Sequence, residues 1–183
     1  MRVKVTDTQP SSHPFVELRF EGPQSVEKQV CSALGVNSIR NLGTLEGKRV
    51  FLRVDANVSP DAKHLDQHPR VKQIAAVVGQ LLQANCKVLI STHRSGSSGE
   101  SISDRSAESV FKSLQREVSA LENQATFIKL RPSEISQGKV REGRYFTRVF
   151  RAFEQLPNGQ ALFIENVRLF PSEKSLSFNT ARL

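Results

Sequence analysis

Residues 49–58 read R-V-F-L-R-V-D-A-N-V, an apolar stretch that ends in an acid and an amide. Its apolar positions are typical of a strand that is buried on both faces of a parallel sheet. They are Val50, Phe51, Leu52, Val54 and Val58. Ligands of open α/β sheets bind just beyond the carboxyl ends of such strands. Asp55 and Asn57 stand there, two residues apart and on the same side, so we expect them to hydrogen-bond a hydroxylated small molecule.

From Gly47 onward, segments of strand character alternate with segments of helix character. Apolar residues recur with helical spacing in residues 71–82, 107–121 and 145–153. Alternation of this kind predicts a parallel sheet with right-handed crossovers, and therefore a three-layer, Rossmann-like α/β fold. The expected strands are Arg49–Val54, Lys87–Thr92, Ala125–Leu130 and Gln160–Asn166.

The start of the chain carries weaker signals. A strand pair is expected near Val3–Val5 and Phe15–Phe20, followed by a short amphipathic helix that begins at Ser25 and stops at Gly35. The chain then divides into an N-terminal extension, an α/β domain and a tail, at residues 1–45, 46–173 and 174–183.

The composition limits the class of protein and of partner. Hydrophobic residues make up 38% and charged residues 24%, which is ordinary for a soluble globular protein. Lys and Arg number 26 against 18 Asp and Glu, a formal net charge of +8 that favours phosphorylated metabolites or nucleic acid as partners. We expect no membrane segment and a cytoplasmic location. Cys31 and Cys86 form no CxxC motif, so both are expected as thiols.

Polar residues at the ends of the predicted strands gather on one edge of the sheet. Asp55 and Asn57 follow the first strand, and Arg70 opens the next helix. His93 and Arg94 follow the second strand, and Glu165-Asn166-Val167-Arg168 follows the fourth. Because the guanidinium fork suits phosphate and carboxylate oxygens, the predicted ligand is a small, hydroxylated, doubly anionic metabolite.

Four blocks of sequence together resemble the N-terminal domain of phosphoglycerate kinase. The family pattern is G-K-R-V-x-x-R-V-D-x-N-V-P, x-R-I, S-H-x-G-R-P and L-L-E-N-x-R-F. This chain has G-K-R-V-F-L-R-V-D-A-N-V, P-R-V, V-L-I-S-T-H and L-F-I-E-N-V-R-L-F, in the same order. The resemblance runs from about residue 38 to residue 173 and implies an incomplete domain, with about four of the family's six N-domain strands.

The resemblance implies the reaction ATP + 3-phosphoglycerate ⇌ ADP + 1,3-bisphosphoglycerate, with a site for 3-phosphoglycerate in this part of the chain. Asp55 and Asn57 match the pair that binds the glycerate part. Arg70 matches the arginine that grips the substrate and offsets charge during phosphoryl transfer. His93 and Arg168 match members of the basic patch around the substrate phosphate.

The chain departs from the family pattern at two points in this region. T-H-R-S-G-S replaces S-H-x-G-R-P, so Gly96 stands at the second arginine position. Arg94 is then the candidate substitute phosphate contact. Loss of one charge-assisted contact would weaken binding by about 1.5–3 kcal/mol. Ser59 also replaces the usual proline.

No residue of this chain matches the family's nucleotide loop, its phosphate-holding lysines or its metal-binding aspartate. We therefore expect no cofactor or metal on this chain, since Mg-ATP and Mg-ADP bind the family's C-terminal domain. Catalysis by this chain alone is not expected, because phosphoryl transfer requires both substrates and the metal in line. A separate chain that supplies the nucleotide domain is one expected partner. A non-catalytic anion- or partner-binding module on the same scaffold is the alternative function.

Alternative interpretations remain for a metal site, for a nucleic-acid partner and for the location of the protein. His64, Asp66 and His68 lie in a polar loop, which favours a structural role over a metal site. The absence of a recognised motif argues against nucleic acid as a partner. Ala181-Arg182-Leu183 has the type of the S-K-L peroxisomal signal, so a peroxisome or glycosome-like organelle is the alternative location, against chance at an arbitrary stop.

Two expectations concern surfaces. Arg141, Arg144, Arg148 and Arg151 share one helical face, for which a solvated face is favoured over an anion-binding ridge. With part of the family's sheet missing, one edge of Arg49–Val54 is expected to be bare, and bare edges promote association.

Overall fold

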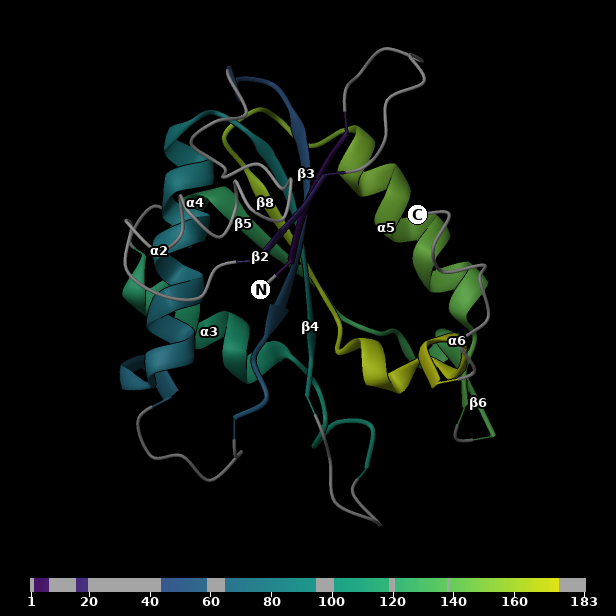
Figure 1. Ribbon diagram of the computed structural model, residues 1–183. Coiled ribbons are helices and arrows are strands. Elements are labelled where there is room, and N and C mark those ends of the chain that lie inside the picture. The colour runs from purple at the N-terminus through teal and green to yellow at the C-terminus, as the bar shows by residue number, and fades with distance from the viewer. Residues whose placement is uncertain are drawn as a thin grey trace.

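The computed structural model describes residues 2–6, 16–19, 44–58, 65–94, 101–118, 121–137 and 139–174. Figure 1 shows a twisted central sheet with helices on both of its faces. The order of the strands in this sheet is β2-β1-β3-β4-β8-β5. Their bounds are Arg2–Thr6 (β1), Val16–Arg19 (β2), Arg49–Asp55 (β3), Lys87–His93 (β4), Ala125–Ile128 (β5) and Ala161–Ile164 (β8).

Most of the described helices lie between strands in the sequence, and the last one follows the last strand. The α-helices are α2 (Pro69–Gln83), α3 (Glu108–Glu117), α4 (Leu121–Gln124), α5 (Glu142–Glu154) and α6 (Pro171–Lys174). Short 3-10 turns are described at η2 (Leu65–Gln67), η3 (Pro132–Glu134) and η4 (Val167–Leu169), and a two-stranded ribbon is formed by β6 (Ile135–Ser136) and β7 (Lys139–Val140).

The parallel α/β fold expected from the sequence is confirmed. β3, β4, β8 and β5 pair in parallel, so all four carboxyl ends lie along one edge of the sheet. The predicted strands 125–130 and 160–166 are shorter than expected, and the helical segment 107–121 is divided into α3 and the start of α4. These are differences at element boundaries, where sequence patterns are least informative.

Two apolar clusters pack on opposite faces of the sheet. Val50, Leu52 and Val54 of β3 face α2 and α3, whereas Phe51 faces α5. This alternation follows from the two-residue period of a strand. Tyr145 of α5 is fully buried, donates its hydroxyl to the Ile128 carbonyl at 2.7 Å and accepts from the Glu165 backbone N–H at 2.8 Å. The phenol therefore joins α5 to β5 and to the end of β8.

The expectation of a bare β3 edge is wrong. β1 pairs antiparallel with β3 from Arg2↔Arg53 to Thr6↔Arg49, and β2 pairs antiparallel with β1. The strand pair expected near the N-terminus therefore continues the sheet and covers the edge of β3. Because that edge is paired, association through it no longer follows from the fold. The helix expected from Ser25 lies outside the described residues.

Cys86 is a free, buried thiol, and burial raises its pKa to about 11. Cys31 and the tripeptide at residues 181–183 lie outside the described ranges. Among the residues that the structure describes, no helix has both the length and the apolar character needed to cross a membrane.

Candidate functional site

The carboxyl end of β3 carries a compact polar cluster. Arg70 donates from Nη1 to Oδ2 of Asp55 at 3.1 Å and to the backbone carbonyl of Asn57 at 3.1 Å. Oδ1 of Asp55 accepts from the backbone N–H of Asn57 at 3.0 Å. The side chains of Arg70 and Asp55 are 47% and 48% exposed, so a ligand can reach both. An exposed pair of this kind contributes little stability and can exchange partners at small cost.

Arg70 is held at the beginning of α2. Pro69 occupies the first helical turn, where its fixed φ suits the helix and no N–H is needed. His68 is the N-cap residue, and its Nδ1 accepts from the Arg70 backbone N–H at 3.2 Å. His68 therefore caps a helix, while His64 lies outside the described residues. No group of three potential metal ligands occurs among the residues that the structure describes.

His93 lies on the other side of Asp55, at the end of β4. Its Nε2 is 3.4 Å from Oδ1 of Asp55, and its side chain is 24% exposed. The pKa of His93 is lowered, chiefly by burial, and Asp55 opposes this while Arg168 and Arg53 add to it. An anion bound beside His93 would favour the imidazolium form and raise this pKa.

Arg168 is exposed on η4, directly after β8. The side-chain oxygen of Asn166 accepts the Arg168 backbone N–H at 3.1 Å and so caps this short turn. Arg168 is close enough to lower the pKa of His93, which ties η4 to the cluster at β3 and β4. Arg53 also lowers the pKa of His93, but its own side chain forms an ion pair with Glu173 of α6.

Arg94 differs from the other expected site residues in its burial. It is only 5% exposed, and its Nη1 donates to the Ser106 carbonyl at 3.2 Å and to Oγ of Ser109 at 3.3 Å. Nη1 of this guanidinium is therefore engaged within the protein. Gly96, where the family has its second arginine, lies outside the described residues.

Two buried residues after β8 hold the site without facing solvent. Asn166 accepts the Arg94 backbone N–H at 2.9 Å, and its Nδ2 donates to the carbonyls of Arg94 and Arg105, both at 2.8 Å. Glu165 accepts from the Ser106 hydroxyl at 2.9 and 3.1 Å and from the Ala107 N–H at 3.1 Å. Sequence position alone did not separate these scaffold residues from ligand-binding ones, because both kinds follow a strand.

The fold and the cluster together define an α/β domain with an acid, a histidine and arginines at the carboxyl edge of a parallel sheet. The family model for phosphoglycerate kinase matches residues 39–182. The chain belongs to the phosphoglycerate kinase family.

Individual relatives agree with this assignment. The phosphoglycerate kinase of Geotalea uraniireducens is 24% identical over 142 residues, covering 77% of this chain and 32% of the relative. That of Anaeromyxobacter sp. is 29% identical over 139 residues, covering 75% of this chain and 32% of the relative. The chain thus spans about a third of the length of these curated relatives.

A solved structure shares the fold. The structure of phosphoglycerate kinase from Coxiella burnetii superposes with a TM-score of 0.53 at 21% identity, covering 80% of this chain and 33% of that one. This likeness shows that the two chains share a fold over the superposed part.

Proposed function

We propose that this chain binds 3-phosphoglycerate at the carboxyl edge of its sheet. The observation that carries the proposal is the exposed cluster in which Asp55 contacts both Arg70 and His93. The cluster is formed by the ends of the neighbouring strands β3 and β4 and by the start of α2. Asp55, Arg70 and His93, which are distant in sequence, therefore lie together. Family membership supports the choice of ligand.

Each residue has a proposed role. Asp55 and Asn57 bind the hydroxyl and carboxylate-bearing glycerate part, because a carboxylate accepts from hydroxyls and an amide both donates and accepts. His93 and Arg168 bind the phosphate, and His93 becomes protonated when it does so. Arg70 contacts the substrate and offsets the charge that develops during phosphoryl transfer in the complete reaction.

The complete kinase reaction needs a second set of groups. We infer that a nucleotide domain, on a separate chain or elsewhere in a longer protein, supplies the site for Mg-ATP. A polypeptide of these 183 residues alone is expected to show no ATP-dependent phosphorylation of 3-phosphoglycerate. A coupled assay with protein free of host enzyme measures this, and turnover above background would contradict it.

A non-catalytic anion-binding module is the second candidate function. The observation that favours it is the burial of Arg94 and the engagement of its Nη1 by Ser106 and Ser109, which disfavour Arg94 as a substitute for the arginine replaced by Gly96. In that case small phosphorylated anions bind with little preference among them.

Calorimetric titration separates the two functions. We expect 3-phosphoglycerate to bind weakly, with the heat lost in Arg70→Ala and in Arg168→Ala. Arg116→Ala, which removes an exposed arginine in the last turn of α3, is the matched control and should bind normally. Equal affinity for inorganic phosphate would favour the anion-binding module, and binding unaffected by the two site substitutions would refute the proposed site.

A further inference from the structure

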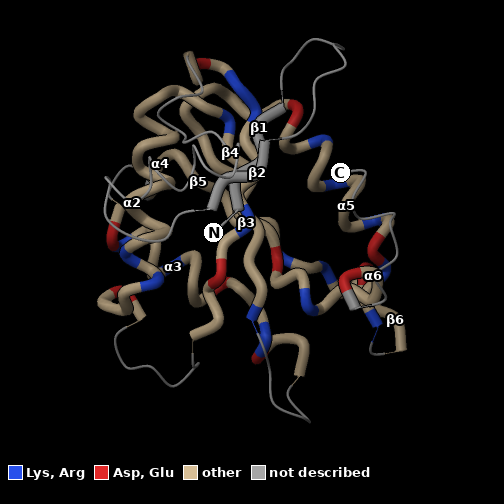
Figure 2. Tube along the Cα trace, viewed as in Figure 1, with Lys and Arg blue, Asp and Glu red and all other residues tan. Residues whose placement is uncertain are grey.

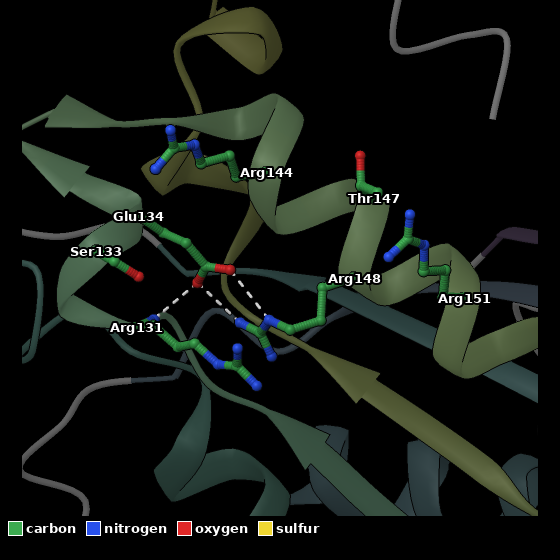
Figure 3. Close-up of a pocket in the computed structure, with 7 residues that line it drawn as sticks. All are labelled: Arg131, Ser133, Glu134, Arg144, Thr147, Arg148 and Arg151. Atoms are coloured by element: carbon green, nitrogen blue, oxygen red, sulfur yellow. Dashed lines mark hydrogen bonds and ion pairs between the residues drawn. The ribbon is translucent and has the colours of Figure 1, made fainter.

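A second basic hollow lies away from the strand-end cluster. It has a volume of about 420 Å³ and shares no lining residue with the proposed 3-phosphoglycerate site. Figure 3 shows residues from η3 and the preceding loop on one side and residues of α5 on the other. We name it the α5 groove, and its lining residues are Arg131, Ser133, Glu134, Arg144, Thr147, Arg148 and Arg151.

The one carboxylate of the α5 groove is fully engaged. Oε1 of Glu134 accepts from Nε of Arg148 at 3.0 Å, and Oε2 accepts from Nη2 of Arg148 at 2.8 Å and from the Arg131 backbone N–H at 2.7 Å. Burial alone would raise the pKa of Glu134, but these donors outweigh it and hold the pKa below its ordinary value. Glu134 therefore stays ionised and neutralises one arginine.

Arg148 is fixed in place as well as neutralised. Its Nη2 also donates to the Lys129 carbonyl at 2.7 Å, and its guanidinium carbon lies 5.3 Å from the centre of the Tyr145 ring. The solvated face expected for the α5 arginines is thus wrong for Arg148, which joins α5 to the segment after β5. These contacts hold Arg148 in place within the lining of the α5 groove.

The remaining charge of the α5 groove is uncompensated. Four guanidinium groups against one carboxylate leave a net charge of +3 on its lining. Within the described part of the chain, the side chains of Arg144 and Arg151 are exposed and have no hydrogen-bond or ion-pair partner. Figure 2 shows the run of basic positions along α5. A concave surface with unpaired arginines attracts anions strongly.

The spacing of the arginines indicates the shape of the anion. Arg144 and Arg151 are seven residues apart on α5, which corresponds to about 10 Å along the helix axis. Figure 3 shows them at separate ends of the α5 groove, with Thr147 and Arg148 between them. A chain of phosphoryl groups suits this spacing better than a single phosphate does.

The lining favours a small molecule over nucleic acid. None of the described residues that line the α5 groove is aromatic, and Tyr145 of the same helix is fully buried. Binding of single-stranded nucleic acid relies on exposed aromatic rings for base stacking. The volume of the hollow falls within the range of small-molecule sites.

We propose that the α5 groove binds a small linear polyphosphate group, with Arg144 and Arg151 contacting phosphoryl groups at its two ends and Arg131 contacting the middle. The ligand is either an inorganic polyphosphate or the triphosphate of a nucleotide, which share this chemistry. The site is separate from the one proposed for 3-phosphoglycerate.

Calorimetric titration with inorganic tripolyphosphate at low salt tests the proposal. Arg144→Glu and Arg151→Glu should each weaken binding about tenfold or more, because each removes a charge-assisted contact and adds a repulsion. Arg116→Glu makes the same change of charge on α3, across the sheet, and should weaken binding less than about twofold. An equal loss in Arg116→Glu would overturn the proposal, because it would indicate attraction by net charge alone.

Competition defines the ligand and the place of binding. Inorganic phosphate should bind far more weakly than tripolyphosphate, and excess 3-phosphoglycerate should not displace tripolyphosphate. Displacement by 3-phosphoglycerate, together with sensitivity to Arg70→Ala, would overturn the proposal by assigning the binding to the strand-end cluster. Similar affinity for a metal-free nucleoside triphosphate indicates that the phosphate chain is recognised, and tighter binding of the nucleotide identifies the nucleotide as the source.

Discussion

Two polar clusters lie at the carboxyl ends of the parallel strands, and they differ in burial. The Asp55–Arg70–His93 cluster is partly exposed, and its contacts are few and exchangeable. The cluster around Glu165 and Asn166 is almost fully buried, and each of its side chains makes several hydrogen bonds. The comparison indicates that the first cluster is available to a ligand and that the second holds the loops around it.

Substitution in the buried cluster should have the largest effect on folding. Asn166→Ala leaves the N–H and carbonyl of Arg94 and the carbonyl of Arg105 without their partner, so we expect a loss of about 3 kcal/mol in the free energy of unfolding. Urea denaturation measures it. Asn123→Ala, at an exposed position of α4, is the control and should cost about 0.5 kcal/mol or less. Similar losses in the two variants would remove the distinction between scaffold and surface.

A pH series sharpens the same distinction. Burial raises the pKa of Glu165 above its ordinary value of 4.5, although hydrogen bonds from Ala107 and Ser106 oppose the shift. Between 4.5 and the raised value, the native state binds more protons than the unfolded state, so stability contributed by this group falls as pH rises. Glu165→Gln removes this titration. The free energy of unfolding of the variant relative to the native chain should therefore rise with pH from 4.5 upward, and parallel curves would contradict the account.

Substitution in the exposed cluster should have the smallest effect on stability and a clear effect on binding. Arg70→Ala breaks an ion pair whose two side chains are nearly half exposed, so we expect a loss of no more than about 1 kcal/mol in unfolding free energy. The same variant should lose 3-phosphoglycerate binding. A loss of stability as large as that of Asn166→Ala would mean that Arg70 belongs to the scaffold.

The sequence predicted much of the fold because its signals were local. Apolar runs and helical periodicity located the four parallel strands. The expected strand ends then predicted that Asp55, Arg70 and His93 would lie close together, as they do. Pairing of β1 with β3 could not be predicted in the same way, since it depends on which edge of the finished sheet is free.

The sequence pattern also did not predict the direction or the burial of polar side chains. Arg94 follows β4 just as Arg168 follows β8, yet Arg94 is buried against Ser106 and Ser109 whereas Arg168 is exposed. The difference arises from the path of the segment before α3, which no local residue preference specifies. For the same reason the sequence alone does not distinguish the α5 groove from an ordinary charged face, because the groove exists only where η3 lies beside α5.

The proposed binding of 3-phosphoglycerate is tested most directly at His93. Its imidazole resonances can be followed by NMR through a pH titration, with and without 3-phosphoglycerate. Without the ligand, the pKa of His93 should lie below the ordinary value of 6.5, because burial, Arg168 and Arg53 outweigh Asp55. With the ligand bound, the phosphate beside His93 should raise this pKa, and the rise should disappear in Arg168→Ala. A pKa of His93 that is the same with and without saturating 3-phosphoglycerate would contradict the proposed site.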